Sequence, residues 1–288
     1  MNLVIDKILY GDARETLKKF ASSDAKAQMC ITSPPYYGLR DYGNEDSQIG
    51  LEESPEEFIA ELVKVFAEVR NCLADDGTLW VNIGDSYYNY RGGKGQALPK
   101  QSVASGMQDL PQVKNPRRGN KLEGYKEKDL IGIPWMLAFA LRADGWYLRQ
   151  DIIWSKPNPM PESVKDRTTK SHEYLFLLSK NQNYYFDVEA IKEPTVDGTQ
   201  MKRKKSVWNV QTKPYKGAHC AVFPSELIAP AILAGSKTND IVLDPFMGSG
   251  TTASVAKELN RNYWGCELHK NYKDLIDKRL DNPARHAV

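Results

Sequence analysis

Short apolar runs alternate with longer amphipathic stretches along almost the whole chain. The apolar runs end at Gly, Pro or acidic residues and predict strands at 3–10, 27–32, 78–83, 147–154, 173–179, 241–244 and 263–267. Apolar residues at helical spacing predict helices from Asp12 to about Phe20 and at 54–73, 134–143, 223–234, 251–259 and 272–280. This alternation is typical of an α/β fold whose mostly parallel, doubly wound sheet is covered on both faces.

Local signals define several of these boundaries. Ser54 and Pro55 are followed by two glutamates, a pattern typical of a helix start, because Ser caps the first turn and the acids face its positive end. Pro34 and Pro35 end the strand at 27–32, since diproline can extend neither a ladder nor a helix interior. The sequence Asp-Asp-Gly at 75–77 predicts a turn before the strand at 78–83.

The bulk composition indicates a globular protein. At 288 residues, 41% hydrophobic and 26% charged, the chain can build one sizeable core, so we expect a single domain over 1–288. The N-terminal residues do not resemble a signal peptide, and the longest apolar stretch, 131–141, is too short for a membrane span. The scattered cysteines favour free thiols, a cytoplasmic location and no metal site. These cysteines are Cys30, Cys72, Cys220 and Cys266.

The net charge of +2 conceals an uneven distribution. Residues 91–128 contain nine basic and three acidic residues, and residues 192–216 contain seven basic and two acidic residues. Basic charge gathered in loop-like segments is typical of proteins that bind a phosphate backbone, although either segment alone could be an ordinary solvated loop. Together with the base-binding motif described below, these segments favour double-stranded DNA as the partner, with the basic insertions 86–128 and 187–216 as candidate target-recognition segments. Their candidate contacts are Arg117, Arg118, Lys202, Arg203, Lys204 and Lys205.

A glycine turn follows the strand at 241–244. Gly248 and Gly250 stand between a strand and a helix, where glycine lets the backbone approach a ligand without a Cβ in the way. Glu267 ends the next strand, where a carboxylate can accept the ribose hydroxyls of an adenosine cofactor. A purely structural turn is the alternative for these glycines. A dinucleotide oxidoreductase would need a second half after the turn, but only residues 251–288 follow, so the rest of the sheet must precede it in a circularly permuted order.

A second motif, Thr32-Ser33-Pro34-Pro35-Tyr36, ends the strand at 27–32. The exocyclic amino group of cytosine or adenine is a poor nucleophile and must be held by acceptors. The Ser33 hydroxyl and the Pro34 carbonyl can supply two, and the Tyr36 ring offers a face for stacking an extruded base. A surface turn is the alternative, because Ser-Pro-Pro is common in loops. Both motifs in one chain favour methyl transfer to a base.

With these motifs, the chain resembles the S-adenosylmethionine-dependent amino-methyltransferases of DNA, in their permuted beta group. The resemblance covers nearly the whole chain and implies a Rossmann-like methyltransferase fold. It implies that Ser33, Pro34, Pro35 and Tyr36 are catalytic and that Lys156, in Trp154-Ser-Lys156-Pro157, contacts DNA. It also implies a set of cofactor contacts. These are Asp12, Thr32, Phe223, Asp244, Pro245, Phe246, Gly248, Ser249, Gly250, Thr251 and Glu267.

The resemblance implies a reaction as well. Members with Ser before the prolines mostly produce N4-methylcytosine, whereas members with Asp mostly methylate adenine, so Ser33 favours cytosine and leaves adenine N6 as the alternative. Methyltransferases that act on a ring carbon need a cysteine nucleophile next to the proline. Here Tyr36 follows Pro35 instead, so we expect direct transfer without a covalent intermediate. A cognate restriction endonuclease would be a functional partner. A DNA-binding regulator without turnover is a further alternative, which the intact Ser33 and Gly250 argue against.

Overall fold

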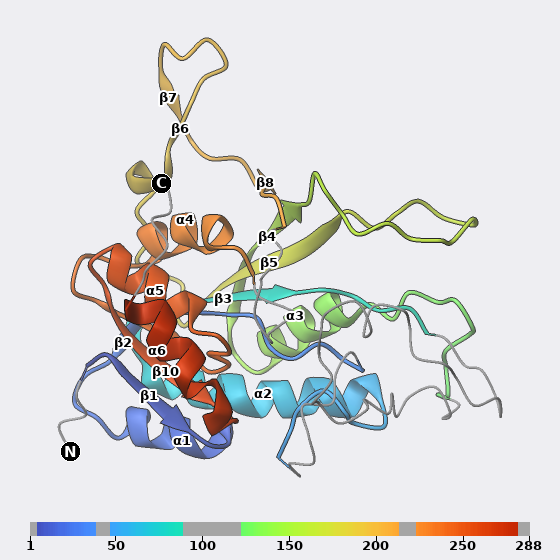
Figure 1. The fold of residues 1–288 in the computed structure, drawn as a ribbon, viewed down its shortest axis with the longest axis horizontal. Coiled ribbons are helices and arrows are strands. Elements are labelled where there is room, and N and C mark those ends of the chain that lie inside the picture. The colour runs from blue at the N-terminus through green and yellow to red at the C-terminus, as the bar shows by residue number, and fades with distance from the viewer. Residues whose placement is uncertain (1–4, 39–46, 89–121, 213–222, 282–288) are drawn as a thin grey trace.

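A computed structural model describes residues 5–38, 47–88, 122–212 and 223–281 (Figure 1). Its centre is an eight-stranded sheet in the order β1-β10-β9-β2-β3-β5-β4-β8. The strands are β1 (Lys7–Tyr10), β2 (Ala27–Thr32), β3 (Leu73–Ile83), β4 (Tyr147–Ser155), β5 (His172–Ser179), β8 (Val207–Asn209), β9 (Ile241–Asp244) and β10 (Asn262–Glu267). All seven strands predicted from the sequence are therefore present.

The strand order is the permuted one. β9 and β10, which come late in the chain, lie between β1 and β2, and the pairings from β1 to β3 are all parallel. β5 pairs antiparallel with both β3 and β4, so the mostly parallel sheet has an antiparallel strand near one end. The carboxyl ends of β1, β2, β9 and β10 consequently meet at one edge, which is where open α/β sheets bind ligands.

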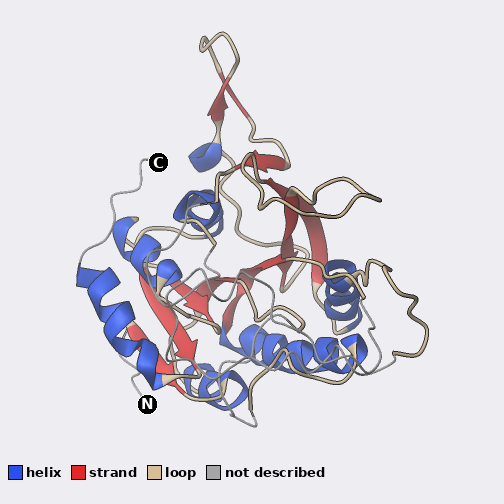
Figure 2. Ribbon diagram, turned by 45° about the vertical axis from the view of Figure 1, so that its right-hand side comes forward, coloured by secondary structure: helices blue, strands red, loops and turns tan. Residues whose placement is uncertain are grey.

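Helices cover both faces of the sheet (Figure 2). One core contains α1 (Ala13–Ala21), α2 (Pro55–Cys72) and α3 (Ile133–Ala143). The other contains α4 (Ser225–Gly235), α5 (Thr251–Glu258) and α6 (Lys273–Asp281). Because side chains alternate along a strand, Met29 and Ile31 of β2 pack in the second core, whereas Cys30 between them packs in the first.

The predicted start of α2 is confirmed in detail. Ser54 accepts a hydrogen bond from the Glu57 amide and the Glu57 carboxylate accepts one from the Ser54 amide, which forms a complete capping box. Pro55 occupies the first turn, and the apolar face from Phe58 to Val69 is buried. The helix ends at Cys72, and its last turn leads directly into β3.

Two local predictions are wrong. Residues 75–77 do not form a separate turn, because β3 begins at Leu73 and runs through them with a register shift against β2. Residues 187–212 are not irregular: they contain the short helix η3 (Glu189–Ile191), a hairpin of β6 (Glu193–Pro194) and β7 (Met201–Lys202), and the edge strand β8. The hairpin projects from the body of the molecule at the top of Figure 1.

Other predictions lie outside the described residues. These are the first two residues of the strand at 3–10, the central part of the insertion 86–128 including Arg117 and Arg118, and the end of 187–216. Among the residues that are described, no helix has the length and hydropathy needed to cross a bilayer.

Candidate active site

The two sequence motifs meet at the carboxyl edge of the sheet. β2 and β9 are neighbours, with Met29 opposite Val242 and Cys30 opposite Leu243. At their ends the Thr32 hydroxyl donates a 2.6 Å hydrogen bond to Asp244 Oδ1. Segments 212 positions apart in the sequence are thus joined directly.

Asp244 holds this junction together through hydrogen bonds to both of its carboxylate oxygens. Its Oδ2 accepts a 2.6 Å hydrogen bond from the Thr252 hydroxyl, and its Oδ1 also accepts one from the Phe246 amide at 3.0 Å. The residue is 2% exposed, and burial raises the pKa of its carboxyl to about 6 despite these hydrogen bonds. In this structure Asp244 therefore fixes the shape of the glycine turn, and its predicted contact with a cofactor stays a prediction.

The glycine turn has the backbone that its sequence requires. Gly248 and Gly250 have φ of 55° and 81°, in the region that side chains rarely adopt. A Cβ on Gly250 would lie 3.1 Å from Ile276 Cγ2 of α6. Gly250 then starts α5, so the turn is pressed between a helix start and a neighbouring helix.

Glu267 closes the turn from the next strand. Its Oε2 accepts a 2.8 Å hydrogen bond from the Gly248 amide and its Oε1 a 2.9 Å bond from the His269 amide. The side chain is 7% exposed, and burial raises its pKa to about 7. Each carboxylate oxygen has a second lone pair, so Glu267 can still accept hydrogen bonds from the hydroxyls of a ligand.

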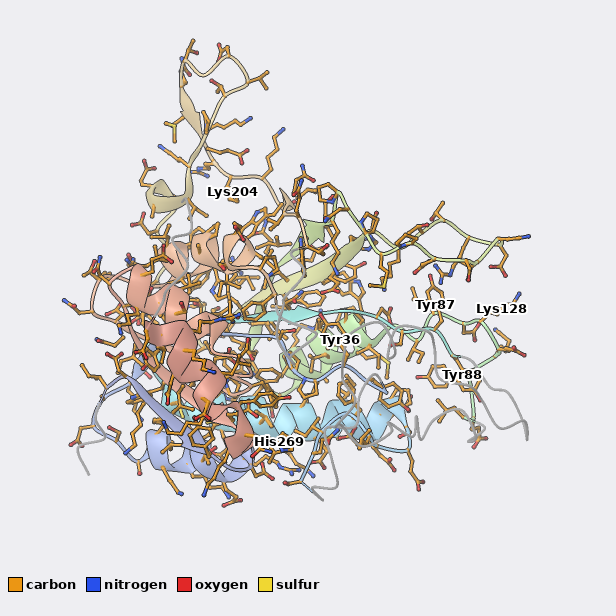
Figure 3. The ribbon with its side chains drawn as sticks, in the orientation of Figure 1. Tyr36, Tyr87, Tyr88, Lys128, Lys204 and His269 are labelled. Carbon is orange, nitrogen blue, oxygen red and sulfur yellow. The ribbon has the colours of Figure 1, made fainter. Side chains whose placement is uncertain are left out.

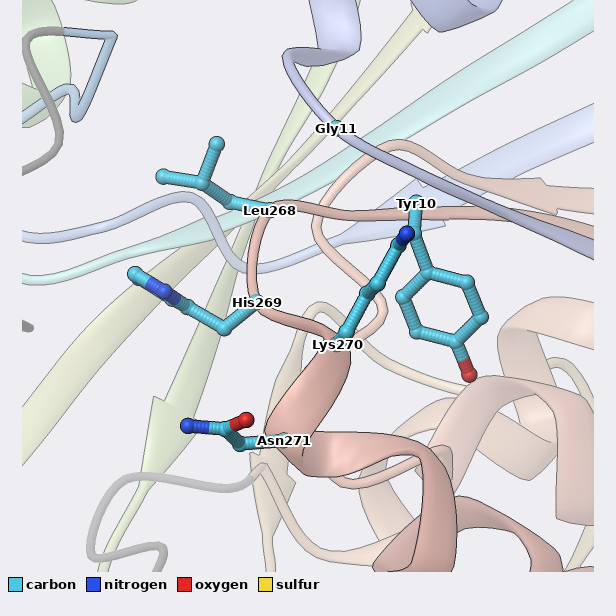
Figure 4. Close-up of a pocket in the computed structure, with 6 residues that line it drawn as sticks. All are labelled: Tyr10, Gly11, Leu268, His269, Lys270 and Asn271. Carbon is cyan, nitrogen blue, oxygen red and sulfur yellow. The ribbon is translucent and has the colours of Figure 1, made fainter.

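A cavity of about 320 Å³ opens at the carboxyl ends of β1 and β10 (Figure 4). Tyr10 and Gly11 line it at the end of β1, and residues 268–271 line it after β10. Its volume is at the lower end of the range for small-molecule sites. A buried carboxylate next to a polar cavity at the strand ends fits the adenosine part of S-adenosylmethionine.

The second motif lies on the other side of the Thr32–Asp244 bond. Pro34 is buried, while Ser33, Pro35 and Tyr36 are half-buried. The Tyr36 hydroxyl donates a 2.6 Å hydrogen bond to Glu173 Oε2 of β5 and also interacts with the Ser33 side chain. Burial, with the Glu173 charge second, raises the pKa of Tyr36 well above its usual value, so its hydroxyl remains a donor at neutral pH.

Comparison with known proteins decides the family. A family model described as DNA methylase matches residues 27–278. The chain belongs to this N6/N4 DNA methylase family. Membership makes the chain a DNA methyltransferase and excludes the dinucleotide oxidoreductase that the glycine turn alone left open.

Individual relatives agree with this assignment. The type II methyltransferase M.Cfr9I of Citrobacter freundii is 52% identical over 96% of this chain and 88% of its own. M.SmaI of Serratia marcescens is 50% identical over 97% and 92%. PvuII DNA methyltransferase (cytosine-N4-specific) has a TM-score of 0.63 at 16% identity, covering 98% of this chain and 95% of that one. A putative DNA modification methylase from Thermus thermophilus, solved with S-adenosyl-L-methionine, has a TM-score of 0.64 at 22% identity and covers 97% of this chain and 94% of that one. These two solved structures confirm the fold.

Some predicted contacts of the methylase have internal partners. Asp12 is the N-cap of α1, accepts a 2.8 Å bond from the Arg14 amide and pairs with the Arg14 guanidinium; a helix cap does not exclude the predicted cofactor contact, which stays a prediction. Ser249 and Thr251 are buried, and their hydroxyls accept hydrogen bonds from Arg279 of α6. Phe223 and Pro245 are also buried, whereas Phe246 is half-buried.

Lys156 does not lie free at the surface. Its ammonium pairs with Glu173 and lies 4.3 Å from the centre of the Trp154 ring, with 17% of the side chain exposed. A contact with a DNA phosphate would require this pair to break. At the end of the hairpin and just after it, Lys202 and Lys204 lie 3.9 and 3.8 Å from Glu193, while Arg203 and Lys205 are exposed.

Three residues at the site were missed in the sequence: Asn82, Gly84 and Asp85. They lie together at the carboxyl end of β3, next to β2, and that position was the available signal. Asp85 accepts hydrogen bonds from the Gly132 and Ile133 amides and so caps α3, whose own N-cap is a glycine. The segment His172-Glu173 also follows the pattern of the family, but the sequence alone indicates no role for Glu173.

Proposed function

We propose that this methylase transfers a methyl group from S-adenosylmethionine to the exocyclic N4 amino group of a cytosine flipped out of duplex DNA. The observation that carries the proposal is the 2.6 Å hydrogen bond from Thr32 to Asp244, because it holds the base motif beside the glycine turn. Residues 1–288 then act as one catalytic domain, with 86–128 and 187–216 as target-recognising segments.

The cofactor half of the site is built from the chain's own backbone and Glu267. When bound, S-adenosylmethionine supplies an electrophilic methyl group on a sulfonium. Glu267, which directly precedes the cavity-lining residues 268–271, would accept hydrogen bonds from the ribose hydroxyls, and Tyr10 and Gly11 would line the same space. Because Gly248 and Gly250 have no Cβ, the backbone after β9 can lie directly against the cofactor.

The base half of the site orients the amino group. The Ser33 hydroxyl and the Pro34 carbonyl accept hydrogen bonds from the amino nitrogen, which favours its pyramidal form and directs its lone pair. The Tyr36 ring stacks on the base, a contact worth roughly 1–3 kcal/mol. Ser33 is too weakly basic for general-base catalysis at neutral pH, so the proton leaves to water after transfer. Ser33 stands where the family members that methylate adenine mostly have Asp, and this supports cytosine as the target base.

The proposal extends to the cellular setting. The similar proteins named above are type II methyltransferases of bacteria, which supports a cytoplasmic enzyme whose functional partner is a restriction endonuclease reading the same site. The exposed Arg203 and Lys205 and the basic segment that includes Arg117 and Arg118 contact the phosphate backbone.

The test is to express the chain in cells that lack DNA methylation and to analyse the hydrolysed DNA by mass spectrometry. We expect N4-methylcytosine, at one sequence that single-molecule sequencing then maps. N6-methyladenine would overturn the base assignment, and unmodified DNA would favour a regulator without turnover.

Ser33→Ala tests the role of the hydroxyl. We expect methyl transfer to fall by at least ~100-fold, because an acceptor for the amino group is removed at the reacting atom, while the Kd for S-adenosylmethionine changes by less than about 2-fold. Ser22→Ala is the matched control, since Ser22 ends α1 far from the motif and bonds only locally to Lys19 O. Normal turnover in Ser33→Ala would refute the assignment.

A further inference from the structure

The Tyr36 hydroxyl is fixed from two strands. Glu173 Oε2 accepts its 2.6 Å hydrogen bond and also one from Asn82 Nδ2 at 3.2 Å. Asn82, 1% exposed, donates as well to the Tyr174 carbonyl at 3.1 Å, which anchors it across the β3–β5 pairing. Figure 3 shows Tyr36 within the body of the molecule, away from the hairpin near whose base Lys204 lies.

The Glu173 carboxylate is itself held by a cation. Lys156, just past the end of β4, pairs with its Oε1, and the two side chains are only 17% and 15% exposed. The Trp154 ring covers the ammonium at 4.3 Å. A carboxylate this buried needs a paired partner, since an isolated buried charge is strongly unfavourable. Lys156 is thus a requirement for Glu173 to accept from Tyr36.

The edge of the Tyr36 ring lies against Gly84. A Cβ at Gly84 would lie 2.8 Å from Tyr36 Cε2 and 3.4 Å from Glu173 Cδ. Backbone therefore occupies the space in which the ring would otherwise tilt. The hydrogen bond of the hydroxyl and the backbone of Gly84 at the ring edge together restrict rotation of the Tyr36 ring.

We propose that Glu173 and Lys156 are positioning residues that hold the Tyr36 ring in the plane against which the target base stacks. The inference rests on the proposed function, because base stacking by Tyr36 belongs to it. A correctly oriented base brings its amino nitrogen in line with the methyl group, and loss of that orientation lowers the rate of the chemical step more than binding.

The test uses the full chain, S-adenosylmethionine and a duplex carrying the mapped site. Tyr36→Phe and Glu173→Gln should each lower kcat about 10-fold, the effect of one hydrogen bond to a charged group, with KM for S-adenosylmethionine changed less than about 2-fold. The double variant should also lose about 10-fold rather than about 100-fold, because Tyr36→Phe removes the hydroxyl and Glu173→Gln removes the charge of the same hydrogen bond. Tyr184→Phe is the control, since its hydroxyl accepts from Arg149 at 3.3 Å beyond the opposite end of β5.

Lys156 separates positioning from DNA contact. Lys156→Ala should lower kcat and Lys156→Arg should restore most of it, with the salt dependence of DNA binding unchanged. A phosphate contact instead would raise KM for DNA and flatten the salt dependence by about one unit of slope with kcat unaffected, and that result would overturn the inference.

The outcomes are distinguishable from failure of the proposed function. Wild-type protein that makes no N4-methylcytosine would sink the proposed function, whereas active wild type with normal kcat in Tyr36→Phe and Glu173→Gln would sink only the positioning role. Binding of S-adenosylmethionine by calorimetry reports folding in every variant. If Glu173→Gln does not bind it, Tyr36→Phe, which removes one oxygen atom, still decides the question.

Discussion

Asp244 and Glu267 are held in surroundings that disfavour their charged forms. Burial raises their pKa values from 3.8 to about 6 and from 4.5 to about 7. Since both folded-state values lie above the unfolded ones, the folded chain binds more protons in this interval, and unfolding becomes easier as pH rises through it. The stability that these groups contribute is present at low pH and lost towards neutral pH. Burial of the two carboxyl groups therefore costs the methylase stability at neutral pH.

Glu267→Gln should reduce this pH dependence. The wild type should lose up to about 3 kcal/mol of unfolding free energy through this group between about pH 4.5 and about pH 8, and the variant should lack that part. Urea unfolding at both pH values measures it, with Glu15→Gln, an exposed ion-pair residue of α1, as control. An undiminished slope in Glu267→Gln would mean that the carboxylate is not strained by burial.

Single residues also mark the limit of sequence reasoning. Thr32, Asp244 and Glu267 were predicted because each ends a buried strand, and strand ends at one edge must converge. The DNA contact expected of Lys156 came from the family resemblance and stays a prediction, but nothing local in the sequence reveals that β4 and β5 bring this lysine to Glu173. Pairings between distant strands determine such contacts.

Among the elements, α6 supports the cofactor turn from outside the sheet. Arg279 donates to the hydroxyls of Ser249 and Thr251, and Ile276 fills the space next to Gly250. The helix was predicted from its periodicity, but its contact with the turn was not. A helix of nine residues with one buried side chain has little packing of its own, so these contacts tie it to the site.

Arg279→Ala should therefore weaken cofactor binding. We expect the Kd for S-adenosylmethionine to rise about 10-fold, equivalent to about 1.4 kcal/mol, with kcat at saturation nearly unchanged. Titration calorimetry measures this, and Lys278→Ala on the same helix is the control. An unchanged Kd would show that the turn keeps its shape without α6.

Element positions were otherwise predicted well where the pattern was strong. β2 and β9 have the predicted bounds, because apolar runs ended by Pro or by an acid before Pro leave little choice. The prediction of a loop at 187–212 was wrong because β6, β7 and β8 are only two or three residues long, which is too short to show an alternation of apolar and polar residues. β8 is a strand only through its pairing with β4.

At the scale of the whole molecule, the site lies at the carboxyl edge of the parallel strands, while the β6–β7 hairpin projects from the body (Figure 1). The hairpin's basic residues are not equivalent. Lys202 and Lys204 lie near Glu193, and Lys204 also lies 5.2 Å from the centre of the Trp208 ring. Arg203 and Lys205 are exposed, so their charges are the ones available to DNA phosphates.

Replacing Arg203 and Lys205 with Gln should weaken DNA binding at all sequences and reduce the slope of log affinity against log salt by about 2, about one for each phosphate that is no longer neutralised. Lys202→Gln and Lys204→Gln together should change the slope less, because Glu193 already offsets their charge. Fluorescence anisotropy over a salt series measures both pairs, and specific and unrelated duplexes distinguish phosphate contact from base reading. Equal slopes for all variants would mean that the hairpin faces away from DNA and that the duplex is bound through other basic residues. A weakening confined to the specific duplex would instead assign the hairpin to base recognition, since a phosphate contact cannot discriminate between sequences.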